Sequence, residues 1–337
     1  MKRAIAVLCI ATLTALWSQE VPAQAPSPHA IDIPDWFVDT FLELREDVAD
    51  AAGKGKRLLI YFGQDGCPYC KLLMETTFRE TRLADKVQRG FLPLALNMWG
   101  DREVTWVDGR RMSEKELARA LKVQYTPTLL MFNEQAEVIV RLNGYLPAHQ
   151  LEAAIDYVAG RLETKRDLSE YVRAAAGPPA SPRLHDEPYF LAAPYDLTGL
   201  RGKRLVVLFE RPNCASCDEL HLDTLKRDEV ARWLTEFTVA RFDPGTRTAL
   251  TTPDGRQTNA AAWARELGIA YVPTLVFFDT SGAEVFRAEA YLRAFHLSSA
   301  LEYVASDAYR SEPSFQRFVQ ARADRMREHG RTVDLWK

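Results

Sequence analysis

The chain contains one pattern twice, and this duplication constrains the fold more than any other feature of the sequence. Residues 55–67 (GKRLLIYFGQDGC) align with residues 202–214 (GKRLVVLFERPNC) at an offset of 147, and residues 125–132 (YTPTLLMF) align with residues 271–278 (YVPTLVFF) at an offset of 146. Such a period matches a domain rather than the roughly 20 to 50 residues of a solenoid repeat. A chain of 337 residues can also form two hydrophobic cores. The sequence therefore predicts two domains that share one fold.

Each copy has the same order of expected elements. β-branched and aromatic residues predict a buried strand directly before a C-x-x-C pair, and apolar residues at three- and four-residue spacings then predict a helix that starts at the first cysteine. A strand, an Asp-Gly turn, a helix, a β-hairpin and a last helix follow in both copies. The expected strands are 57–63, 91–97, 128–132 and 138–142, then 204–210, 237–243, 274–279 and 283–288. The expected helices are 67–89, 113–121 and 147–163, then 214–236, 259–267 and 292–305, with an extra helix over 313–328.

The N-terminus predicts a secretory signal peptide over residues 1–25. A charged start precedes an apolar run over residues 4–17, and residues 21–25 (VPAQA) form a small-residue cleavage motif. The run is shorter than the ~20 apolar residues of a membrane-spanning helix, so a start-transfer anchor is the less favoured alternative. We therefore expect a periplasmic or secreted protein with no membrane span after cleavage. The expected remainder is a first domain over 31–176, a Pro-rich linker over 177–188 and a second domain over 189–337.

Composition and charge limit the partners. Apolar residues make up 47% of the chain and charged residues 26%, which is typical of folded globular protein and excludes a disordered class. The formal net charge of -3 gives no overall field that would attract nucleic acid or an anionic membrane. We therefore expect no nucleic-acid partner.

Four of the five cysteines form two pairs, Cys67-Pro-Tyr-Cys70 and Cys214-Ala-Ser-Cys217. Exported proteins normally use cysteines as widely spaced structural disulfides, so two close pairs indicate reactivity. The first cysteine of each pair begins a predicted helix, where free N–H groups and the helix dipole stabilise a thiolate. Cys67 and Cys214 are therefore the expected nucleophiles, and Cys70 and Cys217 the expected resolving thiols. A purely structural disulfide and a metal site are the alternatives for a C-x-x-C pair.

The order of these parts resembles the thioredoxin family, in which a strand leads into C-x-x-C and a proline precedes a hairpin. The resemblance covers nearly all of the expected mature chain, twice, and implies an α/β fold class with two thioredoxin-like folds in tandem, each a mixed central sheet flanked by helices. Residues 63–71 (GQDGCPYCK) and 291–296 (YLRAFH) look most like SoxW-type periplasmic thioredoxins and related secreted thioredoxin-like proteins. The resemblance also implies cis bonds at Thr126-Pro127 and Val272-Pro273, and a role of these four residues in binding a substrate strand.

Two features typical of efficient reducing thioredoxins are absent. Gly66 and Asn213 replace the tryptophan before the first cysteine, and Tyr61 and Leu208 replace the buried aspartate that accepts a proton. The direction of the reaction is therefore left open. Because the two dipeptides inside the pairs also differ, and Asp218 follows the second pair, we expect unequal reduction potentials.

Four further side chains near the two pairs are not assigned to the redox chemistry. Trp99, Trp106 and Tyr125 could line a substrate groove, but core packing is the favoured interpretation. His221 is the one histidine placed to touch a cysteine pair, and an exposed helix position without a role is favoured for it.

The function that these observations predict is thiol-disulfide exchange on other proteins outside the cytoplasm. The redox-active disulfides Cys67–Cys70 and Cys214–Cys217 would serve in place of a cofactor, and no metal is expected. The partners would be proteins with thiols or disulfides, and a membrane electron-transfer protein is a further hypothesis, with electrons passing through both domains. The alternatives are a disulfide isomerase or chaperone and a non-catalytic binding module.

Overall fold

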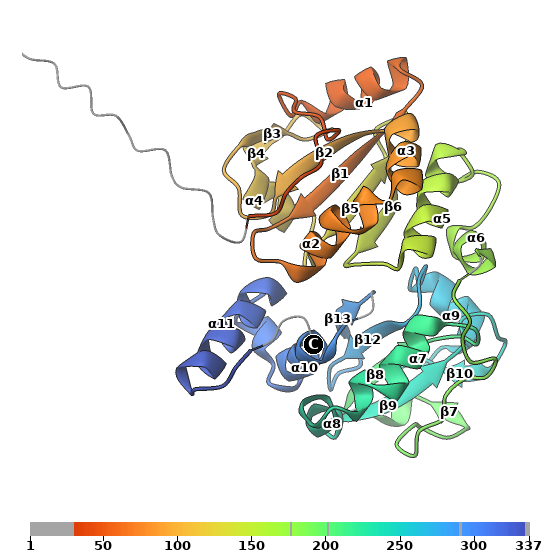
Figure 1. Cartoon of the computed structure of the whole chain (residues 1–337). Coiled ribbons are helices and arrows are strands. Elements are labelled where there is room, and N and C mark those ends of the chain that lie inside the picture. The colour runs from red at the N-terminus through yellow and green to blue at the C-terminus, as the bar shows by residue number, and fades with distance from the viewer. Residues whose placement is uncertain (1–29, 176, 201, 290–291, 334–337) are drawn as a thin grey trace, which may run out of the picture.

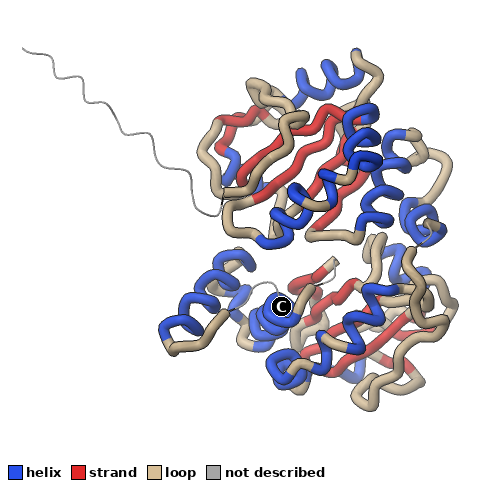
Figure 2. Tube along the Cα trace, viewed as in Figure 1, coloured by secondary structure: helices blue, strands red, loops and turns tan. Residues whose placement is uncertain are grey.

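The computed structural model describes residues 30–175, 177–200, 202–289 and 292–333 (Figure 1). The predicted signal peptide and Tyr291 lie outside these ranges. The described residues form two α/β units, one above the other in Figure 1, and each has a mixed sheet with helices on both faces (Figure 2). The predicted fold class is confirmed.

The first domain is built on a four-stranded sheet of order β2-β1-β5-β6. Strand β1 runs parallel to β2 and antiparallel to β5, and a two-stranded ribbon, β3-β4, forms the inserted hairpin. Its strands are β1 (Arg57–Gly63), β2 (Phe91–Asn97), β3 (Glu103–Thr105), β4 (Arg111–Ser113), β5 (Thr128–Phe132) and β6 (Val138–Asn143). Its helices are α1 (Leu44–Gly53), α2 (Pro68–Glu75), α3 (Thr81–Gly90), α4 (Glu114–Ala120), α5 (Ala148–Ala159) and α6 (Leu168–Ala174), with a 3-10 turn at Thr77–Arg79.

The second domain repeats this arrangement, with β9-β8-β12-β13 as its sheet. Its inserted hairpin, β10-β11, is joined by β7 to make a three-stranded ribbon. The strands are β7 (Tyr195–Asp196), β8 (Arg204–Phe209), β9 (Phe237–Phe242), β10 (Ala249–Thr251), β11 (Gln257–Asn259), β12 (Thr274–Phe278) and β13 (Glu284–Ala288). The helices are α7 (Ala215–Leu222), α8 (Asp228–Leu234), α9 (Ala260–Glu266), α10 (Ala294–Ala305) and α11 (Phe315–Glu328), with 3-10 turns at Thr198–Leu200, Thr224–Lys226 and Ala308–Arg310.

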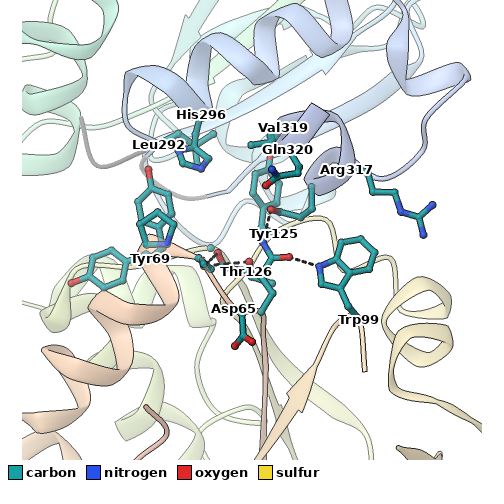
Figure 3. A pocket seen from close by; sticks show the side chains of 17 residues that line it. Asp65, Tyr69, Trp99, Tyr125, Thr126, Leu292, His296, Arg317, Val319 and Gln320 are labelled. Atoms are coloured by element: carbon teal, nitrogen blue, oxygen red, sulfur yellow. Dashed lines mark hydrogen bonds between the residues drawn. The ribbon is translucent and has the colours of Figure 1, made fainter. Parts of the chain in front are cut away.

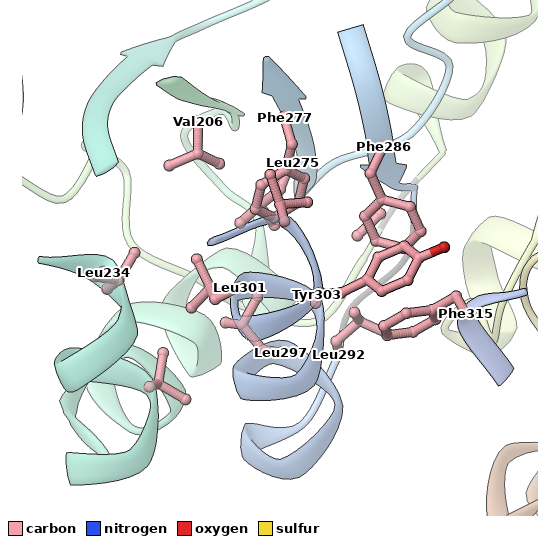
Figure 4. Close-up of a cluster of buried hydrophobic side chains, with 14 of the residues drawn as sticks. Val206, Leu234, Leu275, Phe277, Phe286, Leu292, Leu297, Leu301, Tyr303 and Phe315 are labelled. Atoms are coloured by element: carbon pink, nitrogen blue, oxygen red, sulfur yellow. The ribbon is translucent and has the colours of Figure 1, made fainter. Parts of the chain in front are cut away.

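Each sheet is buried on both faces. All seven residues of β1 are buried, and alternate residues face opposite cores: Leu59 and Tyr61 face the helix that carries Cys70, whereas Leu58 and Ile60 face α1. The second domain has the same two cores, and Figure 4 shows the one in which α10 packs against the sheet. The central strand that leads to each cysteine pair is therefore held rigidly from both sides.

The helix predicted after each first cysteine is broken, so the predictions of one continuous helix over 67–89 and 214–236 were wrong. Helix α2 ends at Glu75, a 3-10 turn follows, and Glu80 is extended before α3 begins. The apolar periodicity hides this break because Leu73, Phe78 and Leu83, one from each part, are buried in the same core. The second domain breaks at the corresponding place, between α7 and α8.

The helix over residues 313–328 is not an extra element, because the sequence analysis missed its counterpart α6 in the first domain. Leu168, Tyr171 and Val172 of α6 occupy the positions of Phe315, Phe318 and Val319 of α11, at an offset of 147. Both helices also begin with a side-chain N-cap that accepts a hydrogen bond from the third residue of the helix. The repeated unit therefore ends with a helix in both copies.

The two domains meet through equivalent surfaces. Tyr125 packs in a core of the second domain, 5.6 Å from Phe286 and 5.3 Å from Phe315 between ring centroids, and its equivalent Tyr271 packs in a core of the first domain. The side chain of Asn143 donates a hydrogen bond to Glu289, which is its own equivalent at an offset of 146. Reciprocal contacts of this kind are those of a two-fold interface. The domains are therefore related by an approximate two-fold axis near Asn143 and Glu289.

Candidate active site at the domain interface

The first cysteine pair opens helix α2. Cys67 is the N-cap residue and Pro68 the first helical residue, so the backbone N–H of Cys70 is free to donate to the Cys67 sulfur at 3.0 Å. The two cysteines form a disulfide with Cα atoms 5.2 Å apart. Cys67 is 4% exposed, whereas Cys70 is fully buried. An incoming sulfur can therefore reach Cys67 and not Cys70.

The loop before β5 lies against the Cys67 sulfur. The Thr126-Pro127 bond is cis, and the backbone oxygen and hydroxyl of Thr126 both lie 3.4 Å from the Cys67 sulfur. The hydroxyl points its donor at that sulfur. Thr126 and Pro127, which the sequence proposes as substrate-binding residues, thus lie beside the predicted nucleophile.

The second cysteine pair has the same backbone surroundings as the first, but one hydrogen-bond donor fewer. Cys214 is the N-cap of α7 and accepts a hydrogen bond from the Cys217 N–H at 3.2 Å. The Val272-Pro273 bond is cis, and the Val272 carbonyl oxygen lies 3.9 Å from the Cys214 sulfur. Valine has no hydroxyl, so the side-chain hydrogen bond of the first site has no counterpart here.

This difference predicts the acidity of the two thiols. We expect Thr126→Val to make the Cys67 thiol less acidic, because a hydrogen bond to a charged group contributes roughly 1.5–3 kcal/mol and water replaces only part of it. The measurement is the pH dependence of iodoacetamide alkylation of the reduced protein. Val272→Thr is the matched converse and should lower the pKa of Cys214. Unchanged alkylation profiles in both variants would show that the hydroxyl does not act on the thiolate.

A buried ionic cluster lies behind the second pair. His221 is 1% exposed, and its ring nitrogens lie 2.8 Å from Glu210 and 3.2 Å from Glu187. Burial lowers the pKa of His221, but the hydrogen bonds and negative charges of the two glutamates outweigh burial and raise the pKa above its usual value. The prediction of an exposed histidine without a role was therefore wrong. Because His221 follows Cys217 by four residues on α7, the cluster lies one turn beyond the cysteine pair.

The predicted linker lies against the second site. The Ser181 carbonyl accepts a hydrogen bond from the backbone N–H of Asn213 at 2.7 Å, and the Ser181 N–H donates to Asp218 at 2.7 Å. His185 pairs with the same aspartate at 2.7 Å and stacks on His221, with ring centroids 4.6 Å apart. These contacts fix the segment on both sides of Cys214, so it is part of the wall of the second site.

The second domain completes the first site. A cavity of about 340 Å³ opens at Cys67, and Figure 3 shows its walls coming from both domains. Gln64 links them: its side chain accepts a hydrogen bond from the Trp99 indole and donates one to Gln316 of α11 at 3.0 Å. The first domain contributes Gln64, Cys67, Tyr69, Trp99 and Thr126, and the second contributes Leu292, His296, Gln316, Val319 and Gln320, among others.

Sequence reasoning missed most of this shared wall. Trp106 is buried against Phe132, as a packing residue. Tyr125 is buried in the interface and also lines the cavity. Trp99 is 37% exposed and lines the cavity, so the packing interpretation was wrong for Trp99. His296 is neutral near pH 7 because burial, and then the charge of Arg322, lower its pKa to about 4. No local sequence signal places His296 opposite Cys67, since the two lie in different domains.

Comparison with known proteins assigns the family. A family model described as a Thioredoxin-like domain matches residues 44–159 and 195–305. The chain belongs to the thioredoxin-like family. It carries the domain twice, and each copy contains one of the cysteine pairs. A comparison with curated proteins gives no match.

Solved structures of thioredoxin-fold proteins are similar to single domains of this tandem thioredoxin-like protein. A thioredoxin-fold protein from Helicobacter pylori is 25% identical, with 40% of this chain and 89% of that chain covered and a TM-score of 0.31. A putative disulphide-isomerase from Bacteroides thetaiotaomicron is 25% identical, with 41% and 98% covered and a TM-score of 0.31. The DsbD C-terminal domain from Neisseria meningitidis is 20% identical, with 32% and 85% covered and a TM-score of 0.25. Within the described ranges, no helix has the length and apolar character needed to cross a membrane.

Proposed function

We propose that this thioredoxin-like protein is a thiol-disulfide oxidoreductase that acts on protein thiols and disulfides outside the cytoplasm. The observation that carries the proposal is the first site: a slightly exposed Cys67 at a helix N-terminus, beside a cis proline and within hydrogen-bond distance of Thr126. The predicted signal peptide supports a periplasmic or secreted location. The same frame around Cys214 supports a second redox centre.

The reaction proceeds by two exchanges of sulfur bonds. The Cys67 thiolate attacks one sulfur of a client disulfide, so that a Cys67–client bond forms and the other client sulfur leaves as a thiolate. Cys70 then loses its proton and attacks the Cys67 sulfur, which closes the Cys67–Cys70 disulfide and releases the second client thiolate. The client gains two electrons and the pair loses two. The reverse sequence oxidises a client dithiol, and Cys214 with Cys217 follows the same steps.

The surroundings of the pairs support unequal potentials. The Cys67 sulfur accepts hydrogen bonds from a backbone N–H and from Thr126, whereas the Cys214 sulfur accepts one from a backbone N–H and has no hydroxyl donor among the described residues. The acidic Asp218 also follows Cys217 directly on α7. A more stable thiolate favours the reduced pair. The first pair should therefore be the stronger oxidant.

Two activity assays separate the proposed function from its alternatives. Insulin reduction measures reductase activity, and refolding of scrambled ribonuclease measures isomerase activity. The mature chain is compared with Cys67→Ser and Cys214→Ser variants. The proposal predicts insulin reduction that falls in both variants. Refolding without insulin reduction would favour the isomerase, and client binding that neither variant changes would favour a binding module.

A further inference from the structure

An interdomain cavity of about 250 Å³ lies beside the loop before the second cis proline, and its lining includes the equivalents of several residues that line the cavity at Cys67. In both cavities the loop before the cis proline forms the floor, and the last two helices of the other domain form the far wall. The equivalent lining residues are Tyr125 and Tyr271, Thr126 and Val272, His296 and Gln150, Val319 and Val172, Gln320 and Arg173, and Gln64 and Arg211.

The last two of these equivalences change charge. The second cavity is lined by four arginines, of which Arg173 and Arg211 replace glutamines of the first; the others are Arg247 and Arg265. Two carboxylates, Asp167 and Glu170, line the same cavity. Asp167 accepts a hydrogen bond from the backbone N–H of Glu170 at 3.1 Å, and the Glu170 carboxylate lies 4.0 Å from Arg173. Because the first copy has Gln320 and Gln64 at the positions of Arg173 and Arg211, the fold does not require arginine at these two positions.

The guanidinium of Arg211 is not fully hydrogen-bonded within the described part of the protein. Its buried Nε forms no hydrogen bond with any described residue. Burial lowers the pKa of its guanidinium, and the positive charge of Arg173 lowers it further, while Asp243 opposes these effects. Asp243 accepts a hydrogen bond from the backbone N–H of Gly245 at 2.8 Å. Two arginines from different domains thus face one space, and Asp243 and Glu170 offset part of their positive charge.

The cavity continues into a groove that extends to the residue before Cys214. Arg173, Arg211 and Gly245 line both the cavity and a larger open depression, which extends along residues 177–180 to Pro212 and Asn213. Asn213 precedes Cys214 in the chain. A ligand that occupies both the cavity and the depression is therefore extended, and negative charge on it would pair with Arg173 and Arg211.

We propose that the groove binds an extended polypeptide segment with acidic residues, and so presents acidic clients to the second redox pair. The preference for acidic segments rests on the groove alone, and the delivery of a cysteine to Cys214 rests on the proposed function. The first site, with glutamines at the equivalent positions, would not share this preference.

Binding is tested with a fluorescein-labelled heptapeptide of six glutamates around a central serine, and with the same peptide in which glutamine replaces glutamate. We expect fluorescence anisotropy to show at least tenfold tighter binding of the glutamate peptide to the mature chain. R173Q/R211Q, which installs the residues of the first site, should remove that preference without lowering the melting temperature. R89Q/R331Q removes the same charge from exposed positions outside the groove and should keep the preference.

Equal binding of the two peptides, or an equal loss in R173Q/R211Q and R89Q/R331Q, would overturn the inference. A second assay separates this failure from failure of the proposed function. Disulfide-linked cysteine versions of both peptides are reduced by a C67S/C70S variant, in which only the second pair can react. Faster reduction of the glutamate peptide supports the inference, and equal rates overturn it. Selective binding without any reduction establishes that the arginine-lined groove binds acidic segments, and it refutes redox activity of the second pair.

Discussion

Replacement of Cys67 by serine in a chain that also lacks the second pair is expected to lower the rate of insulin reduction by at least about 1000-fold. The background is Cys214→Ser with Cys217→Ser, so the first pair carries all activity. Removal of a covalent nucleophile leaves only binding and positioning, and a serine hydroxyl is not ionised near neutral pH. Stopped assays of released insulin thiols measure the loss. The structure supports this large effect because Cys70 is fully buried and so cannot replace Cys67 as the nucleophile.

A variant of the resolving thiol gives the matched control. Cys70→Ser in the same background keeps the nucleophile and lacks the second step, so it should accumulate a mixed disulfide between Cys67 and the client. Electrophoresis without reductant, followed by mass spectrometry of the linked peptides, identifies the bond. If the client were linked through neither cysteine, or if Cys67→Ser retained activity, the assigned roles would be wrong.

Removal of the His221 side chain is expected to destabilise the second domain by about 3–5 kcal/mol. The ring is buried between Glu210 and Glu187, and Glu210 is itself fully buried. His221→Ala leaves the Glu210 carboxylate without its closest partner, and loss of one member of a buried ion pair typically costs this amount. Urea unfolding, followed by the fluorescence of the tryptophans, measures the free energy of unfolding. A loss below about 1 kcal/mol would mean that the cluster does not stabilise the fold.

The raised pKa of His221 also predicts how the free energy of unfolding changes with pH. Because the folded-state pKa of His221 is raised, its contribution is fully present below the unfolded value of about 6.5 and is lost as the pH rises through the folded value. The urea midpoint of the second domain should therefore fall as the pH increases above about 6.5. His221→Met, which installs the equivalent residue Met74 of the first domain, should be less stable and should lose this slope. An identical slope in the variant would assign it to other groups.

Much of the fold could be predicted because the chain is duplicated. A strand, a C-x-x-C pair, a Pro-Thr and a hairpin recur at nearly constant offsets, and each expected strand matches a strand of the structure to within one residue. The helix breaks could not be predicted, since Leu73 and Phe78 are buried in one core on either side of the first break. Helix α6 is short and has a single buried residue, Val172, so its apolar pattern is weak.

Only the parts of the candidate sites that lie within one domain could be predicted. The cysteines and the cis prolines follow from local patterns, but the shared walls depend on how the domains meet. The sequence predicts that Tyr125 is a packing residue, but nothing in it shows that Tyr125 and Tyr271 each pack in a core of the other domain. Glu210 is at the end of a strand, where charged residues usually face water, and its partner His221 lies on a different element. Such a pairing is a property of the tertiary structure.

The most direct test of the central claim is a redox titration of each cysteine pair in the full mature chain. The protein is equilibrated in thiol-disulfide buffers of stepped potential, free thiols are alkylated, and mass spectrometry counts the modified cysteines in each pair. The account predicts that both pairs titrate as two-electron couples above about −300 mV, the range of exchangeable disulfides, with the first pair at the higher potential. Two pairs that both remain oxidised below about −300 mV would be structural disulfides, and that result would contradict the account.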